Sequence, residues 1–272
     1  MFRPSLTLIS LAVSAPSFAN DAQKDMERII VSGSRVIESI DEVPASITVI
    51  SRKQIEDHLK VNPELQSLLA QMVPGLAPDT GSSSNTGQSL RGRAPLVMID
   101  GVPQSTPLRN GSLGVKTIDP SALARIEVIK GATSVYGNGA SGGIINYITK
   151  QATAQDTHEG QVSLSSRFSA VKLEESAGAR ISAAINGKVE NFDYLVTASY
   201  EENGVQRDAE GDILGLQYGL SDAETQNYFT KLGYDFDQEK RLQFSYNYFS
   251  PQQNTDLGDV PGDINKGVKT SA

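Results

Sequence analysis

Apolar and polar side chains alternate along five stretches of the second half of the chain. In the third stretch, Phe192, Tyr194 and Val196 would share one face of a strand, because successive side chains of a strand point to opposite sides. Alternation over roughly ten residues is typical of membrane β-barrel strands, with apolar side chains toward lipid and polar ones toward the lumen. An antiparallel sandwich alternates as well. The apolar positions of the five stretches are Val162, Leu164 and Phe168; Ala179, Ile181, Ala183 and Ile185; Phe192, Tyr194, Val196, Ala198 and Tyr200; Tyr228, Leu232, Tyr234 and Phe236; and Leu242, Phe244, Tyr246 and Tyr248.

The connections between these stretches distinguish the two architectures. Residues 187–190 and 237–240 are short polar turns, whereas residues 202–224 form a long connection rich in Gly, Asp and Glu. Short turns at one end and longer loops at the other are typical of outer-membrane barrels, as are aromatic side chains beside the turns. The pattern therefore predicts the first antiparallel strands of a transmembrane β-barrel within residues 155–272.

The sequence pattern of the first half of the chain predicts a small α+β domain, with a mixed sheet and short helices. Residues 45–50 alternate as a strand, and Ser51 with Gln54 three positions later forms a capping box that begins a helix. Residues 62–63, Asn-Pro, begin a second helix, and residues 74–75, Pro-Gly, end it. The apolar face of this second helix carries Leu65, Leu68, Leu69 and Met72.

A glycine-rich segment raises the question of nucleotide binding. Residues 137–142 read G-x-G-x-x-G, a pattern that holds dinucleotide phosphates when it follows a strand and begins a helix. Residues 124–131 predict the strand, but residues 144–149 are mostly β-branched or aromatic and predict a second strand. The sequence therefore argues against a nucleotide-dependent enzyme.

Composition narrows the function further. The chain has 272 residues, a net charge of −8 and a pI near 4.9, which disfavours nucleic acid as a partner. The absence of cysteine excludes disulfides, thiolate metal sites and a cysteine nucleophile. His58, in a predicted helix, and His158, in a predicted hinge, lie far apart and in no catalytic or metal-binding motif. We therefore expect no enzyme, no catalytic residue, no cofactor and no metal site.

The N-terminus predicts export. Residues 1–19 combine a basic start at Arg3, an apolar run over residues 6–13 and the small residues Ser17 and Ala19. This is the pattern of a secretory signal peptide cleaved after Ala19. No later run approaches the roughly 20 apolar residues that a membrane helix needs.

Three motifs in the first half occur in a fixed order. They read SLRGR at residues 89–93, IDGVPQ at residues 99–104, and IDPSALARIEVIKGATSVYGNGASGGIINYITK at residues 118–150. Together they resemble the plug domain of TonB-dependent outer-membrane receptors. The resemblance implies a plug domain over residues 43–154, preceded by a TonB-box segment and linker at residues 20–42. Within this family, the sequence is most similar to ferric hydroxamate receptors of the aerobactin type.

The resemblance also implies roles for three groups of residues. A TonB box would offer its backbone to a strand of the periplasmic protein TonB; the first strand of the plug is the alternative for this segment. Polar loops of the plug would form an apex that meets an anionic ferric chelate, and charged side chains beside the motifs would pair with the barrel wall. The candidates are Glu27, Arg28, Ile29, Ile30, Val31 and Ser32 for TonB; Arg93, Gln104, Arg109 and Asn110 for the ligand; and Arg91, Asp100, Arg125, Glu127 and Lys130 for plug–barrel pairing.

The function implied by the resemblance is ferric siderophore uptake by a monomeric receptor in the outer membrane of a Gram-negative cell. TonB, the siderophore and outer-membrane lipid would be its partners. Five strands cannot close a barrel that uses about 22 in plugged transporters, and residues 263–272 read as a loop-like tail, so we expect a fragment or a truncated product. Two alternatives stay open: a receptor for another ligand, such as a different siderophore, haem or cobalamin, and a non-transporting plug that acts as a periplasmic binding module.

Overall fold

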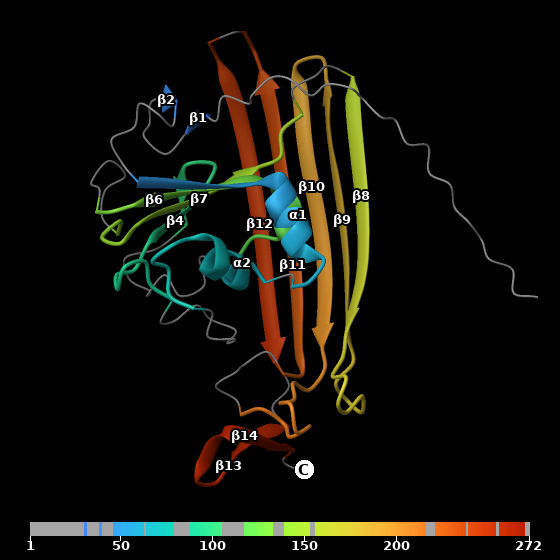
Figure 1. Ribbon diagram of the computed structural model, residues 1–272. Helices are drawn as coiled ribbons and strands as arrows, with labels where there is room; N and C mark the ends of the chain where they lie inside the picture. Colours follow the sequence, from blue (N-terminus) through green and yellow to red (C-terminus); the bar gives the residue numbers. More distant parts are fainter. Residues whose placement is uncertain are drawn as a thin grey trace, which may run out of the picture.

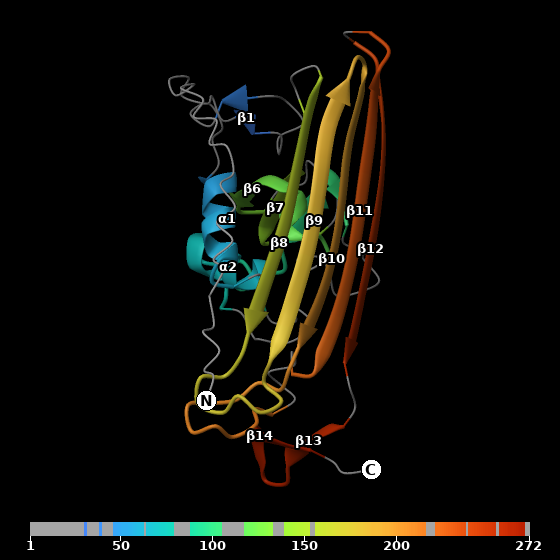
Figure 2. The same ribbon diagram turned by 90° about the vertical axis from the view of Figure 1, so that its right-hand side faces the viewer.

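The described residues form two five-stranded sheets and two small two-stranded sheets (Figure 1). The computed structural model describes residues 30–31, 38–39, 46–62, 64–78, 88–104, 117–132, 139–152, 156–215, 221–237, 239–253 and 256–269. The strands of the first sheet run across those of the second, and the first sheet with its helices lies against one face of the second (Figures 1 and 2). No helix among these residues is long and apolar enough to cross a membrane.

The first sheet belongs to the mixed α+β domain expected from the first half of the chain. Its strands follow the order β3-β6-β7-β4-β5, in which only the β4–β7 pair is parallel. The elements are β3 (Ser46–Ser51), α1 (Arg52–Leu59), α2 (Leu65–Met72), β4 (Leu96–Ile99), β5 (Val102–Pro103), η3 (Pro120–Ala122), β6 (Leu123–Lys130) and β7 (Gly143–Thr149).

The capping box of the first helix and the glycine-rich segment behave as the sequence predicts. Ser51 and Gln54 form the capping box of α1. The second helix begins later than the Asn-Pro signal predicts: α2 starts at Leu65 after Glu64, and the Asn62 side chain accepts a hydrogen bond from the Glu64 amide before the helix. Gly75 adopts a φ of +89° after α2, as expected from the Pro-Gly stop signal. β6 and β7 are antiparallel neighbours, and strand β7 begins at Gly143. A strand therefore follows the glycines where a nucleotide site would need a helix.

The second sheet is a meander of five long antiparallel strands, as predicted. It consists of β8 (Thr157–Arg167), β9 (Gly178–Val189), β10 (Phe192–Asn203), β11 (Ala223–Asp235) and β12 (Arg241–Gln253), with β8 and β12 at its edges. Its apolar face is exposed: Leu164 and Phe244 retain most of their surface. The polar face of its three middle strands is buried against the first sheet, as at Thr197 and Lys231. This inversion, apolar outward and polar inward, is typical of barrel strands around a plug.

Two inward-facing apolar residues of the long strands belong to the main core. Leu195 and Phe229 pack in the same buried cluster as Ile50, Leu69 and Tyr147 of the first sheet and its helices. The alternation did not single out these two positions, because they interrupt an otherwise polar face. They join the α+β domain to the second sheet through apolar contact.

Three further local predictions are wrong. The turn before β10 lies at Glu190 and Asn191, because β9 continues through Val189, which pairs with Phe192. His158 belongs to β8 and not to a hinge.

The third error concerns the predicted tail over residues 263–272. Its described part is the strand β14 (Asp263–Lys269), which pairs with β13 (Leu257–Val260). Gly262, with a φ of +89°, closes this hairpin. The hairpin also bonds to the long connection after β10, since the Gly267 amide donates to the Ile213 carbonyl. Such distant pairing gives no local sequence pattern.

Candidate functional site

The boundary between the two sheets holds a buried ion pair at Asp100. Asp100 and Gly101 have φ values of 48° and 80°, as expected for the two-residue turn that joins β4 to β5. In this position the Asp100 carboxylate accepts hydrogen bonds from the Thr149 amide at 2.9 Å and from its hydroxyl at 2.7 Å. It also accepts one from the Lys231 ammonium at 3.1 Å. One carboxylate thus joins β4, β7 and the long strand β11.

A second buried ion pair links η3 to β9. The side chain of Asp119 caps η3 by accepting a hydrogen bond from the Ser121 amide at 2.8 Å, and it also binds the guanidinium of Arg180. Arg180 lies 3.4 Å from Glu201 of β10, which in turn binds Arg167 at 2.9 Å. Burial alone would raise the pKa of Asp119, but the Arg180 charge and the hydrogen bonds from Ser121 and Ser199 outweigh it and lower that pKa.

A third contact uses the backbone. The carbonyl of Thr117 accepts hydrogen bonds from the side-chain amides of Asn227, at 2.9 Å, and Asn247, at 2.6 Å. These residues belong to β11 and β12. Together the three contacts fasten the first domain to the polar face of β9, β11 and β12.

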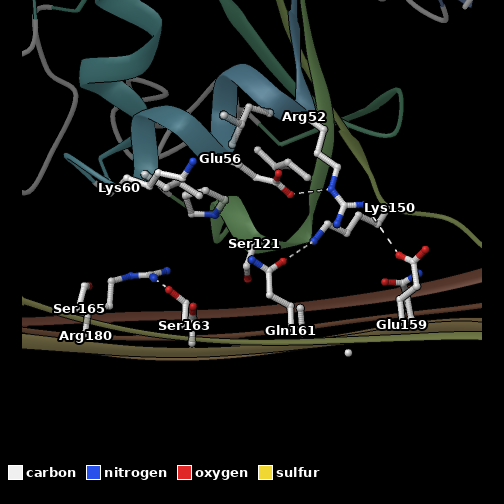
Figure 3. A pocket seen from close by; sticks show the side chains of 18 of the residues that line it. Arg52, Glu56, Lys60, Ser121, Lys150, Glu159, Gln161, Ser163, Ser165 and Arg180 are labelled. Atoms are coloured by element: carbon white, nitrogen blue, oxygen red, sulfur yellow. Dashed lines mark hydrogen bonds and ion pairs between the residues drawn. The ribbon is translucent and has the colours of Figure 1, made fainter. Parts of the chain in front are cut away.

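Helix α1 contacts the second sheet much less closely. A cavity of about 830 Å³ separates this helix from β8 and β9 (Figure 3). Two polar contacts between described residues cross it: Arg52 lies 3.8 Å from Glu159, and the Lys150 ammonium donates to Gln161 at 3.4 Å. Burial, and then the positive charge of Arg52, lower the pKa of Lys150. The polar lining residues include Arg52, Glu56, Lys60, Ser121, Lys150, Glu159, Gln161, Ser163, Ser165 and Arg180.

Comparison with known proteins identifies this arrangement. Residues 39–144 match the family model described as TonB-dependent Receptor Plug Domain. The chain is 32% identical over 257 residues to the ferric aerobactin receptor of Klebsiella pneumoniae, an alignment that covers 93% of the chain and 34% of that protein. This chain belongs to the TonB-dependent receptors. It is also 31% identical over 247 residues to the rhizobactin receptor of Rhizobium meliloti, covering 89% of the chain and 33% of that protein.

Solved TonB-dependent receptors have the same fold. The ferric enterobactin receptor of Pseudomonas aeruginosa in complex with enterobactin aligns with a TM-score of 0.55 at 24% identity, over 76% of this chain and 33% of that one. The pyoverdine receptor of the same species aligns with a TM-score of 0.59 at 22% identity, over 80% and 29%. The chain therefore spans about a third of the length of the receptors it matches. The first sheet and its helices are the plug, and β8–β12 are strands of the barrel wall.

The residues that TonB-dependent receptors would use for ligand and partner are only partly described. Arg93 and Gln104 are both exposed, at opposite ends of the segment that contains β4 and β5. Ile30 and Val31 form β1 (Ile30–Val31), which pairs with β2 (Glu38–Ser39). The other candidates lie outside the described residues: Glu27, Arg28, Ile29, Ser32, Arg109 and Asn110.

The plug–barrel candidates differ in where they lie. Arg125 and Glu127 form an ion pair of 2.8 Å with each other, within β6. Arg91 is exposed, with a φ of 53°, and its amide donates to the Gly75 carbonyl. Lys130 is half-buried at the end of β6. Asp100 does reach the wall, through Lys231.

Sequence reasoning missed most of the groups that join plug to wall. Asp119 was not singled out, although its position before Pro120 in the plug motif is a helix-capping signal. Arg180, Asn227, Lys231 and Asn247 were assigned correctly to the polar face by alternation, which gives no indication of their partners. Among the described residues, no group of three or more His, Asp or Glu side chains lies close enough to hold a metal ion.

Proposed function

We propose that this chain acts in an outer-membrane receptor that takes up ferric siderophores with energy supplied by TonB. The observation that carries the proposal is the similarity to the ferric aerobactin receptor, which extends through the plug and into the wall over 93% of the chain. Activity, ligand and partners are proposed for the whole receptor, because the chain spans about a third of the length of its relatives. The plug docked on the polar face of the wall supports the same function.

A membrane location is supported by the outer face of the wall. The strands have 11 to 13 residues, enough for the 9–11 residues that a tilted membrane strand needs. Their outward side chains are apolar, and Phe192, Tyr194, Tyr234 and Phe236 cluster beside the short turns, where an aromatic girdle would meet the lipid headgroups. Export would follow from the signal peptide predicted at residues 1–19.

The two ends of the wall would face different compartments. Short turns in barrels lie in the periplasm and longer loops outside. By this rule, the end with the turns at residues 190–191 and 236–240 is periplasmic, and β1 and β2 lie at that end (Figure 1). TonB would bind there, by adding a strand to residues 27–32. The ligand would enter from the opposite end, which carries the long connection and the β13–β14 hairpin.

No covalent step is needed for this function. Arg93, Gln104, Arg109 and Asn110 would supply hydrogen-bond donors to an anionic ferric chelate at the plug apex. TonB would then pull the N-terminal segment and rearrange the plug, so that the chelate passes to the periplasm. The inner-membrane proton gradient would drive the movement through TonB.

The experiment is an uptake assay with radiolabelled iron bound to aerobactin, in cells that carry the complete gene and lack other siderophore receptors. We expect uptake that requires TonB. Ile30→Pro should abolish uptake and leave surface binding intact, because proline lacks the N–H that a strand partner needs. Ile30→Val is the matched control. Uptake without TonB, or import of haem or cobalamin in place of the ferric chelate, would contradict the proposal.

A further inference from the structure

The plug is attached to the wall unequally on its two sides. On one side, buried polar contacts join it to β11 and β12, and the Asp119–Arg180 pair lies at the boundary, since Arg180 also lines the cavity. On the other side, a cavity of about 830 Å³ lies between α1 and β8–β9. This difference bears on where a ligand could pass.

The attached side depends on desolvated charges. The side chains of Asp100 and Lys231 are 17% and 3% exposed. Those of the second pair, Asp119 and Arg180, are 5% and 11% exposed. Separating such a pair leaves a buried charge without its partner, which is strongly unfavourable. The Thr117 carbonyl adds two hydrogen bonds in the same region. These contacts resist any movement of β4, β7 and η3 away from the wall.

The polar contacts that cross the cavity are weaker than those on the attached side. Arg52 and Glu159 keep 45% and 63% of their side-chain exposure and lie 3.8 Å apart, so water and salt screen their attraction. The hydrogen bond from Lys150 to Gln161 is long, at 3.4 Å. Figure 3 shows Arg52, Lys150, Gln161 and Glu159 converging at one end of the cavity. These two contacts therefore oppose a wider separation only weakly, whereas the β3–β6 pairing and the buried side chains of Ile50 and Ile55 still hold β3 and α1 to the plug core.

The connectivity of the plug favours movement on this same side. Among the described strands, β3 lies at the edge of its sheet and pairs with β6, and α1 follows it directly. Because residues 46–59 form the N-terminal part of the plug sheet, a pull from the N-terminus reaches β3 and α1 first. Their displacement requires separation of β3 from β6, but it leaves the Asp100–Lys231 pair in place, because neither residue of that pair lines the cavity.

The cavity itself suits a hydrophilic ligand. More than half of its lining residues are polar, and its volume of about 830 Å³ lies within the range of roughly 300–1,000 Å³ of small-molecule sites. Ser163, Ser165 and Gln161 of β8 offer uncharged hydrogen-bonding groups along the wall.

We propose that the ferric chelate crosses the barrel between α1 and the β8–β9 wall, while the contacts of the plug with β11 and β12 stay closed. This inference rests on the proposed function and adds the route to it. The route is the cavity of Figure 3, widened by displacement of β3 and α1.

Thiol cross-linking in the receptor from the complete gene tests the route, and the chain itself contains no cysteine that would compete. The first pair, Arg52→Cys with Glu159→Cys, spans the cavity. The matched control pair, Thr117→Cys with Asn247→Cys, spans the attached side. Each pair is linked with a short reducible bis-thiol reagent, and ferric aerobactin binding and uptake are then measured before and after reduction.

We expect the cavity link to lower uptake at least about tenfold, reversibly and without loss of surface binding, because the gating movement is blocked. The link on the attached side should leave uptake within about twofold of the unlinked receptor. Normal uptake by the receptor with the cavity link, or equal inhibition of uptake by both links, would contradict the proposed route. Failure of the unlinked receptors and the wild type to import the chelate would instead count against the proposed function. If the first pair folds poorly, Lys60→Cys with Ser165→Cys spans the same cavity.

Discussion

Lys231 of the wall and Asp100 of the plug lie 131 positions apart in the sequence and form an ion pair of 3.1 Å. The Lys231 ammonium also donates to the Thr149 hydroxyl, which is itself bound to Asp100. The three groups therefore satisfy one another where little water reaches them. This closed arrangement makes the pair a fixed point between plug and barrel.

Replacing the lysine should weaken the folded state. Lys231→Met keeps most of the side-chain volume but leaves the buried Asp100 carboxylate without a cation, which typically costs about 3–5 kcal/mol. The free energy of unfolding, measured by urea titration of the receptor in detergent, should fall by that amount. Asp100→Asn should have a similar effect, and the double variant should lose less than the sum of the two.

An exposed lysine serves as the control. Lys240 pairs with Asp237 at 3.4 Å in the turn before β12, and 76% of its side chain is exposed. Lys240→Met should not change the urea midpoint measurably, because exposed pairs contribute little. Equal effects at Lys240 and Lys231 would mean that the Asp100 pair is not desolvated in the receptor.

The sequence predicted strands and faces better than it predicted contacts. Val196 and Lys231 could be placed on opposite faces of the wall, because a strand repeats every two residues. The partner of Lys231 could not be inferred, since β11 and the turn at Asp100 meet only in the folded chain. The hairpin at β14 was missed for a related reason: its pairing with residues 213–215 is distant, and its own residues have no apolar alternation.

Gly143 should tolerate no side chain. Its φ is +126°, and a Cβ atom there would lie 2.3 Å from the Ile129 carbonyl oxygen of the neighbouring strand. Gly143→Ala should therefore destabilise the plug by at least about 2 kcal/mol, from backbone strain and the clash together. Gly160→Ala in β8, where a Cβ would meet no atom within 4 Å, should stay within about 0.5 kcal/mol of wild type. Urea unfolding compares the two, and a tolerated alanine at Gly143 would contradict the β6–β7 register.

Acid should weaken the second ion pair. The pKa of Asp119 is lowered below its ordinary value of 3.8. A carboxyl group whose pKa is lower in the folded state contributes stability that is present above the unfolded pKa and is lost as the pH falls toward the folded one. The stability of the receptor should therefore fall with decreasing pH below about 3.8, in part through Asp119.

Asp119→Asn isolates this contribution. The variant should be less stable than wild type at neutral pH, because Arg180 loses its counter-charge, and the difference should shrink as the medium is acidified below pH 3.8. Proteolysis of the plug at a series of pH values gives the comparison. A constant difference at all pH values would show that the charge of Asp119 does not support the docked state.

The last prediction separates a wall in lipid from a wall in water. Val196 lies near the middle of β10 on the outward face, with 39% of its surface exposed. In water, arginine at such a position would change stability little, because its charge stays solvated. In a bilayer, arginine near the midplane on the lipid face costs about 2–4 kcal/mol. Val196→Arg should therefore reduce the free energy of folding into lipid vesicles by that amount, whereas Ser163→Arg, on the inward face of β8, should have a much smaller effect. Equal effects of the two substitutions would mean that the outward face of β10 does not contact lipid.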